Sequence, residues 1–447
     1  MLHLPSASSS PAAFSILRSG SHSTPAEVVG PRRVVRAAAP AAHRLERQLA
    51  AARAEHRALS AQVHRLDRAA YPSAEARLLK KRRLREKDRI SALLGALRAA
   101  REAAGAWELG RGGCGKVVLG RAIGGGGGGG GLVAVKLQPR GELSLQREAR
   151  VLHALRGKGR CFPRRLHFGR QRLAGEAAEV LVMELLGPSL EQLWWATSGG
   201  TTLSPTCVLL LGVQMLSSLR RLHATGYVHN DVKPSNFCLG LSGPAARRVH
   251  LVDFGLCTAR GEHLHAKGTP LFSSADAQSG RPPVGADDVE SLVYVLVYLA
   301  RGTLPWEEES HKTALAITGG KESASLTRTK RGTSRRALVD GLPWPLACTI
   351  STLAREVARA RGVPSEEAEG VGLDYSACTR ALHRGLVYTV RRDKRRIRSR
   401  SGGSVTVGGV PRSGFDWTDQ GISWRPGGEI VDADGATLRR AGSSSQA

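Results

Sequence analysis

The feature that most constrains the fold of this chain is a pair of short motifs in its second half. One is HNDVKPSN, which contains Asp231, Lys233 and Asn236, and the other is DFG, which begins at Asp253 after a short, mostly apolar strand. Asp231 is of the type that orients a hydroxyl group and accepts its proton, and Lys233 of the type that neutralises a phosphate. Asn236 and Asp253 offer oxygen ligands for magnesium. We therefore predict Asp231 and Lys233 as catalytic residues and Asn236 and Asp253 as metal ligands.

A second pattern lies upstream and supplies candidate phosphate contacts. Residues 110–117 read GRGGCGKV and match G-x-G-x-x-G-x-V, in which glycines let backbone N–H groups approach phosphate oxygens closely. VAVK follows as a predicted buried strand ending at Lys136, and Glu148 lies twelve residues further on in a predicted helix. Lys136 would hold the α- and β-phosphates while Glu148 fixes its amine. Either residue alone has a simpler interpretation: Lys136 as an exposed lysine at the end of a strand, and Glu148 as a solvated residue on a helix.

The order and spacing of these motifs resemble those of the eukaryotic protein kinases. The resemblance implies an α+β, two-lobed protein kinase fold with a small β-rich N-lobe and a larger α-helical C-lobe. It also implies ATP and Mg²⁺ as cofactors, and transfer of phosphate to serine or threonine of protein substrates. One short acidic motif arises easily by chance, but two at this separation, downstream of the glycine pattern, do not.

Further stretches are similar to the casein kinase 1 group, including the tau-tubulin and vaccinia-related kinases. They are LVMELLGPSLE at 181–191, NF at 236–237, DDVESL at 287–292 and LPW at 304–306. The resemblance implies that Met183 is the gatekeeper, that Glu184 and Leu186 offer backbone groups to adenine, that Cys238 helps to floor the purine, and that Asp288 braces the catalytic loop. The full predicted set of ATP-binding residues is Gly110, Gly112, Gly115, Val117, Ala134, Lys136, Glu148, Met183, Glu184, Leu186 and Cys238.

Two departures from the family pattern bear on activity. Asn230 stands where most members carry an arginine that pairs with a phosphate on the activation segment, which predicts either activity independent of that phosphate or a weaker enzyme. The segment 255–268 is short and lacks a piece that helps the family to recognise pre-phosphorylated substrates, so Arg260, Lys267 and Lys312 would supply positive charge instead. We expect a preference for acidic or phosphorylated protein substrates. A pseudokinase scaffold, catalytically weak or inactive, is the alternative.

Composition divides the chain into four parts. The first is rich in Ser, Ala, Pro and Gly with a single acidic residue, which is typical of a disordered tail and also suits a transit peptide. The predicted parts are 1–42 for this tail, 43–104 for a basic helical hairpin or coiled coil, 105–390 for the kinase domain (N-lobe 105–186, C-lobe 187–390) and 391–447 for a basic, then polar extension.

The hairpin prediction depends on apolar spacing. A four-three alternation that is typical of a coiled-coil seam runs through Leu45, Leu49, Ala52, His56, Leu59, Val63 and Leu66. A second predicted helix carries the basic run KKRR at 80–83. The stretch resembles a family of small bacterial helical-hairpin proteins of unknown function, in LKK at 79–81 and KDRI at 87–90. We expect a coiled-coil partner through residues 43–104.

Charge and hydropathy limit the classes of partner. The 447 residues carry a formal net charge of +28, which favours anionic partners. The basic runs at 77–89 and 391–400 contain no interleaved aromatic residues, so no specific nucleic-acid recognition is predicted. No apolar run approaches the length of about 18 residues that spans a bilayer, so no membrane span is predicted. We expect the cytoplasm or the nucleus, with an organelle left open by the tail.

The cysteines raise one further hypothesis. All seven are scattered singly, which is typical of reduced thiols. Cys114 lies in the glycine pattern and Cys257 lies two residues after DFG. The positive charge of a phosphate-binding loop would lower a thiol pKa and allow redox control. Loop filling and core packing are the simpler roles for both residues.

Overall fold

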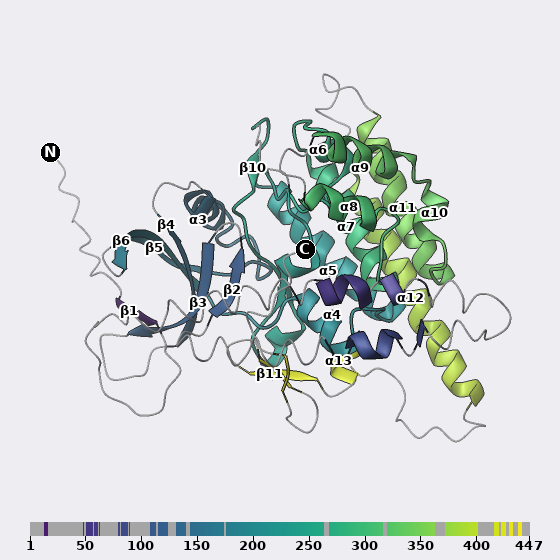
Figure 1. The fold of residues 1–447 in the computed structure, drawn as a ribbon, viewed down its shortest axis with the longest axis horizontal. Helices are drawn as coiled ribbons and strands as arrows, with labels where there is room; N and C mark the ends of the chain where they lie inside the picture. Colours follow the sequence, from purple (N-terminus) through teal and green to yellow (C-terminus); the bar gives the residue numbers. More distant parts are fainter. Residues whose placement is uncertain are drawn as a thin grey trace.

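Two lobes make up the body of the molecule, a β-sheet lobe at the left of Figure 1 and a helical lobe at the right. The two-lobed α+β architecture expected from the motifs is therefore confirmed. The computed structural model describes residues 13–16, 48, 51–56, 58–60, 62, 79–80, 82–87, 89, 108–112, 115–123, 131–139, 144–173, 176–262, 268–315, 320–362, 372–400, 415–419, 422–425, 429–431 and 437–439.

Strands dominate the first part of the chain and helices the second. The strands are β1 (Ala13–Ile16), β2 (Glu108–Gly112), β3 (Gly115–Ile123), β4 (Leu132–Pro139), β5 (Arg165–Leu173), β6 (Glu176–Glu184), β7 (Tyr227–Val228), β8 (Phe237–Leu239), β9 (Val249–Leu251), β10 (Thr258–Ala259), β11 (Ser423–Arg425), β12 (Glu429–Val431) and β13 (Thr437–Arg439). The helices are α3 (Ser144–Ala154), α4 (Leu190–Ser198), α5 (Pro205–His223), α6 (Ala275–Gln278), α7 (Gly285–Arg301), α8 (Glu307–Leu315), α9 (Gly320–Gly332), α10 (Arg335–Val339), α11 (Trp344–Arg361), α12 (Tyr375–Arg400) and α13 (Asp416–Asp419), with short 3-10 turns η1 (Pro234–Asn236) and η2 (Gly243–Arg247).

An antiparallel sheet forms the smaller lobe. Its strands follow the order β1-β3-β4-β6-β5, and β2 also pairs with β3. Side chains alternate between its two faces. Val133 and Val135 therefore join a valine cluster on one face, while Ala134 belongs to the main core and Lys136 is buried. The alternation of VAVK thus turns Lys136 to the same side as Ala134.

α7 is the central helix of the larger lobe. Every residue from Ala286 to Leu299 is buried, and α5 and α11 both pack against it. α12 in turn packs against α5 and α11. α5 begins with Pro205 directly after Ser204, whose Oγ accepts a hydrogen bond from Cys207 N. Serine at the N-cap followed by proline is the arrangement that favours a helix start at this point.

The folded domain continues beyond residue 390, where composition places its end. α12 crosses this position and ends at Arg400. Phe415 and Trp417 lie in the core of the helical lobe, 3% and 1% exposed, with their rings stacked 4.8 Å apart. Few apolar residues mark this segment in a polar, glycine-rich sequence, so composition underestimates the length of the domain.

The same segment makes polar contacts with the helical lobe. Asp416 accepts hydrogen bonds from Ser204 N at 2.6 Å and from Ser204 Oγ at 2.5 Å, at the start of α5. Trp424, in the sheet β11-β12-β13, donates from Nε1 to the carbonyl oxygen of Gly240 at 3.3 Å. A Cβ on Gly187 would lie 2.5 Å from the indole nitrogen of Trp424, so only glycine fits there.

β1 belongs to the segment 1–42, whose composition predicts a disordered tail or a transit peptide. It pairs antiparallel with β3, so these four residues form an edge strand of the smaller lobe. The other residues of 1–42 lie outside the described residues, as do most of the glycines at 124–131. Within the described ranges, no helix combines the length and the apolar character that a membrane span requires.

The hairpin region is helical at its described positions between 48 and 62 and between 79 and 89. Arg82 Nη2 lies 2.7 Å from Glu55 Oε1, which joins the two parts. Ala52 is buried, and the ring of His56 lies 6.0 Å from that of Trp195 on α4. Ala52 and His56 of the predicted seam thus pack against the helical lobe, where the spacing predicts a coiled-coil partner.

Candidate active site

The catalytic candidates meet around the carboxylate of Asp231, between β7 and β8. Asp231 accepts hydrogen bonds from Asn236 Nδ2 at 3.0 Å and from Thr269 N and Oγ1 at 2.9 and 2.8 Å. Lys233 Nζ lies 2.9 Å from Asp231 and donates to Thr269 Oγ1. Burial alone would raise the pKa of Asp231, but the attraction of Lys233 outweighs it and the pKa lies below its usual value. The carboxylate is therefore charged at neutral pH and able to accept a hydrogen bond from a substrate hydroxyl.

Asp288, at the start of α7, holds the backbone of the catalytic loop. It accepts hydrogen bonds from the N–H groups of His229 and Asn230 at 2.7 and 2.9 Å, and His223 Nε2 lies 2.7 Å from its Oδ2. Burial would raise the pKa of this carboxyl group, but the hydrogen bond with His223 contributes most to lowering it below the usual value. A charged Asp288 thus fixes two consecutive peptide groups, as the family resemblance implies.

Asn230 occupies a backbone conformation that few residues tolerate. Its φ of 68° is left-handed, a region in which Asn is several-fold enriched. Its Nδ2 donates to the carbonyl oxygen of Leu256 at 2.8 Å and lies 2.9 Å from Thr258 Oγ1. The side chain therefore ties the catalytic loop directly to the segment after Asp253, through contacts that involve no phosphate group.

Lys136 lies between two carboxylates in the smaller lobe. Its Nζ donates to Glu148 Oε2 at 2.6 Å and to Asp253 Oδ1 at 2.7 Å. Burial would lower the pKa of Lys136, but attraction to Asp253 and Glu148 raises it above the usual value. Burial likewise opposes ionisation of Asp253, yet Lys136 lowers its pKa to about 2. The contacts join β4, α3 and the residue after β9 into one charged cluster.

The two predicted metal ligands lie at the ends of two paired strands. Asn236 precedes β8 and Asp253 follows β9, and these strands pair. Val252 N donates to the carbonyl oxygen of Asn236 at 2.9 Å, and Asp253 turns at a φ of 63°. Among the described residues no group of three or more His, Cys, Asp or Glu could hold a metal alone. A divalent ion bound here would need phosphate oxygens and water as further ligands, as magnesium with a nucleotide does.

The described residues of the glycine pattern lie on β2 and β3. Gly110 and Gly112 are in β2, which pairs antiparallel with β3. Gly115 opens β3 with a φ of 120°, and a Cβ there would lie 2.4 Å from the carbonyl oxygen of Leu137. Glycine is therefore required at this position by the close approach of β4. Cys114 lies outside the described residues.

The remaining ATP-binding candidates come from adjacent strands and the segment that follows them. They are Val117 on β3, Ala134 on β4, Met183 and Glu184 on β6, Leu186, and Cys238 on β8. Ala134 and Met183 are register partners, and both are buried. The side chain of Glu184 accepts a hydrogen bond from Arg164 N at 3.2 Å, and its backbone N–H donates to the carbonyl oxygen of Arg164 at 2.9 Å. Burial raises the pKa of Cys238 to about 12 and keeps its thiol uncharged.

Two residues that the sequence analysis passed over also hold the site together. Thr269 contacts both Asp231 and Lys233. Lys330, on α9, donates to the carbonyl oxygens of Pro270 and Ser273, both at 2.6 Å. The Gly-Thr pair at 268–269 offered a signal for Thr269, but Lys330 belongs to a basic helix that resembles a solvated one.

Cys257 is fully buried, and burial raises the pKa of its thiol well above the usual value. Because the thiolate is the reactive form, the redox-control hypothesis fails for Cys257. The three residues expected to supply positive charge for substrate binding differ in exposure and in their ion pairs. Arg260 is exposed, Lys312 Nζ lies 3.1 Å from Glu308, and Lys267 lies outside the described residues.

Comparison with known proteins agrees with this geometry. A family model described as "Protein kinase domain" matches residues 106–339, which contain the catalytic loop, the charged cluster of Lys136 and the glycine pattern. The chain belongs to the protein kinase family. The predicted family and fold are therefore confirmed, and the use of ATP and a divalent metal follows from the family. A second model, "Protein of unknown function (DUF465)", matches residues 49–94 in the hairpin region.

Curated relatives place this kinase in the casein kinase 1 group, as predicted. It is 34% identical over 261 residues to "Casein kinase 1-like protein HD16" of Oryza sativa subsp. japonica, covering 53% of this chain and 34% of the relative. It is 33% identical over 227 residues to "Casein kinase I homolog 2" of Saccharomyces cerevisiae, covering 47% of this chain and 39% of the relative. The chain thus spans well under half the length of these relatives.

Proposed function

We propose that this kinase transfers the γ-phosphate of ATP, bound with Mg²⁺, to serine or threonine hydroxyl groups of protein substrates. The observation that carries the proposal is the arrangement around Asp231. A charged carboxylate is held by Thr269 and Asn236, with the amine of Lys233 at 2.9 Å. This is the combination of proton acceptor and phosphate-binding cation that phosphoryl transfer to a hydroxyl group needs.

Each group of the site has a distinct task in this proposal. Asp231 orients the incoming hydroxyl and accepts its proton as the new P–O bond forms and the bond between the γ-phosphate and ADP breaks. Lys233, beside it, neutralises the transferred phosphate, and Lys136 contacts the phosphates that stay on the nucleotide. When bound at Asn236 and Asp253, Mg²⁺ would offset the charge that builds on the phosphate oxygens.

We also propose that acidic or phosphorylated proteins are preferred and that activity does not need a phosphate on the activation segment. The net charge of +28 and the exposed Arg260 favour anionic substrates. The hydrogen bonds of Asn230 to Leu256 and Thr258 provide the link between the catalytic loop and the activation segment without a phosphate.

The test is incorporation of labelled phosphate into casein by the full chain with Mg²⁺ and ATP. Asp231→Asn and Asp253→Asn are expected to reduce incorporation by at least a factor of about 100, whereas Glu308→Gln on the exposed surface of α8 should leave it unchanged. Thermal unfolding without nucleotide checks that each variant is folded, and nucleotide binding by the wild type is followed by its thermal stabilisation. A folded wild-type protein that binds nucleotide but transfers no phosphate would overturn the proposal in favour of a pseudokinase scaffold.

A further inference from the structure

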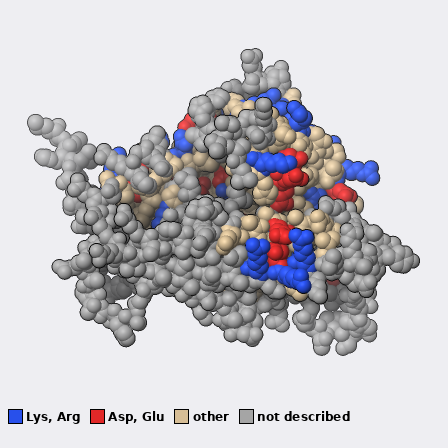
Figure 2. Space-filling model, in the orientation of Figure 1, with Lys and Arg blue, Asp and Glu red and all other residues tan. Residues whose placement is uncertain are grey.

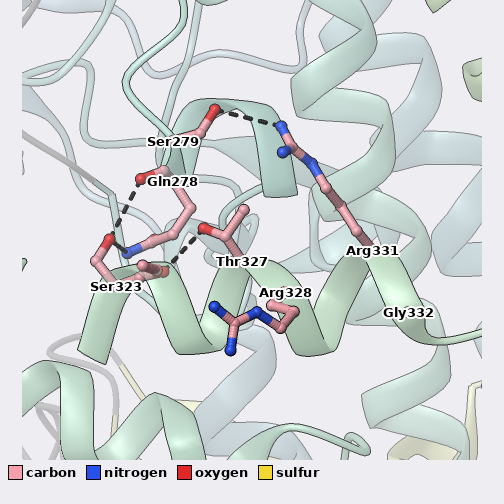
Figure 3. Close-up of a pocket in the computed structure, with 8 residues that line it drawn as sticks. Gln278, Ser279, Ser323, Thr327, Arg328, Arg331 and Gly332 are labelled. Atoms are coloured by element: carbon pink, nitrogen blue, oxygen red, sulfur yellow. Dashed lines mark hydrogen bonds between the residues drawn. The ribbon is translucent and has the colours of Figure 1, made fainter. Parts of the chain in front are cut away.

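A polar pocket opens between α6 and α9 on the helical lobe, as Figure 3 shows. Its volume is about 710 Å³. Gln278 and Ser279 at the end of α6 form one wall, and Ser323, Thr327 and Arg328 of α9 contribute to the other. None of the residues that line it is an ATP-binding, catalytic or metal candidate. The pocket is therefore a feature separate from the active site.

One polar atom in the wall lacks the partner that its burial calls for. Gln278 is 2% exposed, and its side-chain Nε2 donates to Ser323 Oγ at 2.9 Å. The backbone carbonyl oxygen of Gln278 accepts a hydrogen bond from the same hydroxyl at 3.3 Å. Gln278 Oε1 is buried but accepts no hydrogen bond from the described residues. Buried acceptors in folded proteins are almost always paired. Oε1 is therefore available to an N–H or O–H group of a ligand.

The pocket also carries uncompensated positive charge. Arg328 is exposed, and no carboxylate of the described ranges pairs with it. The nearby Asp276 accepts from Arg331 at 2.7 Å and also lies within 3.5 Å of Arg281 and 3.4 Å of Arg361. Arg361 also pairs with Asp287 and Glu290, and none of these three described carboxylates pairs with Arg328. On the face in Figure 2, Lys and Arg side chains follow the upper edge of the helical lobe.

α9 connects the pocket with the active site. Lys330, on this helix, donates to the carbonyl oxygens of Pro270 and Ser273. The segment held in this way begins at Thr269, which contacts Asp231, and runs directly into α6. The segment from Thr269 to α6 therefore connects Asp231 with the pocket. A protein substrate whose hydroxyl group lies at Asp231 is bound at the Thr269 end of this segment, and the pocket lies at the α6 end. This position favours part of a bound protein over a free small anion as the occupant.

We propose that the pocket between α6 and α9 docks an acidic segment of the protein substrate. A carboxylate or phosphate group of that segment pairs with Arg328, and a backbone N–H or a hydroxyl group donates to Gln278 Oε1. The inference rests on the proposed phosphotransferase function because it takes the substrate to be a protein. It adds a recognition surface remote from every residue that contacts ATP.

Peptide binding tests the pocket without phosphate transfer. The full chain carrying Asp231→Asn is titrated into fluorescent peptides that have alanine at the acceptor position and either Asp and Glu, phosphoserine, or Gln in the remaining polar positions. Adding Arg328→Ala is expected to weaken binding of the acidic and phosphorylated peptides about tenfold, because a charge-assisted hydrogen bond is lost. Arg335→Ala, an exposed arginine on α10 outside the pocket, is the matched control and should leave binding unchanged.

Turnover separates the inference from the function on which it rests. With Asp231 intact, Arg328→Ala should lower the ratio of kcat/KM for acidic over neutral peptides about tenfold. Gln278→Leu should weaken binding of the same acidic and phosphorylated peptides. Thermal unfolding checks that this variant is folded. Equal binding by the Arg328→Ala and Arg335→Ala proteins would overturn the docking site. An Arg328-dependent affinity for acidic peptides with no turnover by the wild type would support docking and overturn the phosphotransferase proposal instead.

Discussion

Two lysines, one in each lobe, are buried to nearly the same extent, but their pKa values are shifted in opposite directions. Lys136 is 5% exposed and Lys330 is 4% exposed. Burial disfavours the charged form of both, but the carboxylates of Asp253 and Glu148 raise the pKa of Lys136 above its usual value. Among the described residues no carboxylate acts on Lys330, and burial lowers its pKa to about 7. The partners of a buried lysine, and not the depth of its burial, therefore decide its charge.

The partners also suit different tasks. Lys330 donates to two carbonyl oxygens and lies 5.7 and 5.5 Å from the ring centroids of Tyr294 and Trp306. A neutral amine still has two N–H groups for those carbonyls, so Lys330 can hold the activation segment without a charge. Lys136 must keep its charge, because its proposed role is to attract phosphate oxygens.

The largest effect is expected from removing the charged member of the pair. Lys136→Met leaves two carboxylates without their cation and removes the proposed phosphate contact, so kcat/KM should fall on the order of a thousandfold, or about 4 kcal/mol. Phosphate incorporation at varied ATP concentration measures it, with Lys158→Met at an exposed position as the control. Activity within tenfold of wild type would show that Lys136 is a structural lysine like Lys330.

The second effect concerns pH and the other lysine. Because the folded-state pKa of Lys330 lies below its unfolded value, its contribution to stability is complete above the unfolded pKa and declines as pH falls towards about 7. Relative to Lys330→Met, the wild-type free energy of unfolding should therefore rise with pH, by up to about 1.4 kcal/mol per unit above pH 7. Urea unfolding at pH 7, 8 and 9 measures the difference. Parallel stability curves for the two proteins would show that Lys330 keeps its proton.

A smaller effect is expected when only one carboxylate of the Lys136 cluster is neutralised. Glu148→Gln keeps the shape of the side chain and leaves Asp253 at 2.7 Å from the amine, so kcat/KM should fall roughly tenfold to thirtyfold. Steady-state kinetics with Glu308→Gln as the matched control measure it. A loss as large as that of Lys136→Met would mean that Glu148 alone sets the position of the lysine.

Much of the active site follows from the sequence because its residues occur in short motifs whose order is informative. The motifs HNDVKPSN and DFG predicted roles for Asp231 and Asp253, and VAVK predicted a buried strand that ends at Lys136. Thr269 and Lys330 were not predicted, because each is a single residue whose partners lie far away in the sequence. Thr269 and Asp231, for example, are 38 residues apart. Local periodicity carries no information about such contacts.

The segment at 415–439 shows a different limit. Its composition is polar and rich in glycine, which predicts a polar extension beyond the kinase domain. Yet Trp417 is 1% exposed, and Asp416 accepts hydrogen bonds at the start of α5. A few large side chains are enough to anchor a polar segment when a lobe already offers them a site, and composition averages over those few.

The contact between Ser204 and Asp416 spans 212 residues of chain, and this separation has a consequence for biosynthesis. At ribosomal rates of about 5–20 residues per second, Asp416 is made roughly 10 to 40 s after Ser204. Throughout that interval the nascent helical lobe has neither the carboxylate at the start of α5 nor the indole of Trp417 in its core. The lobe can therefore complete its packing only after the segment at 415–439 has left the ribosome, and until then chaperones would meet it with this part of its core uncovered.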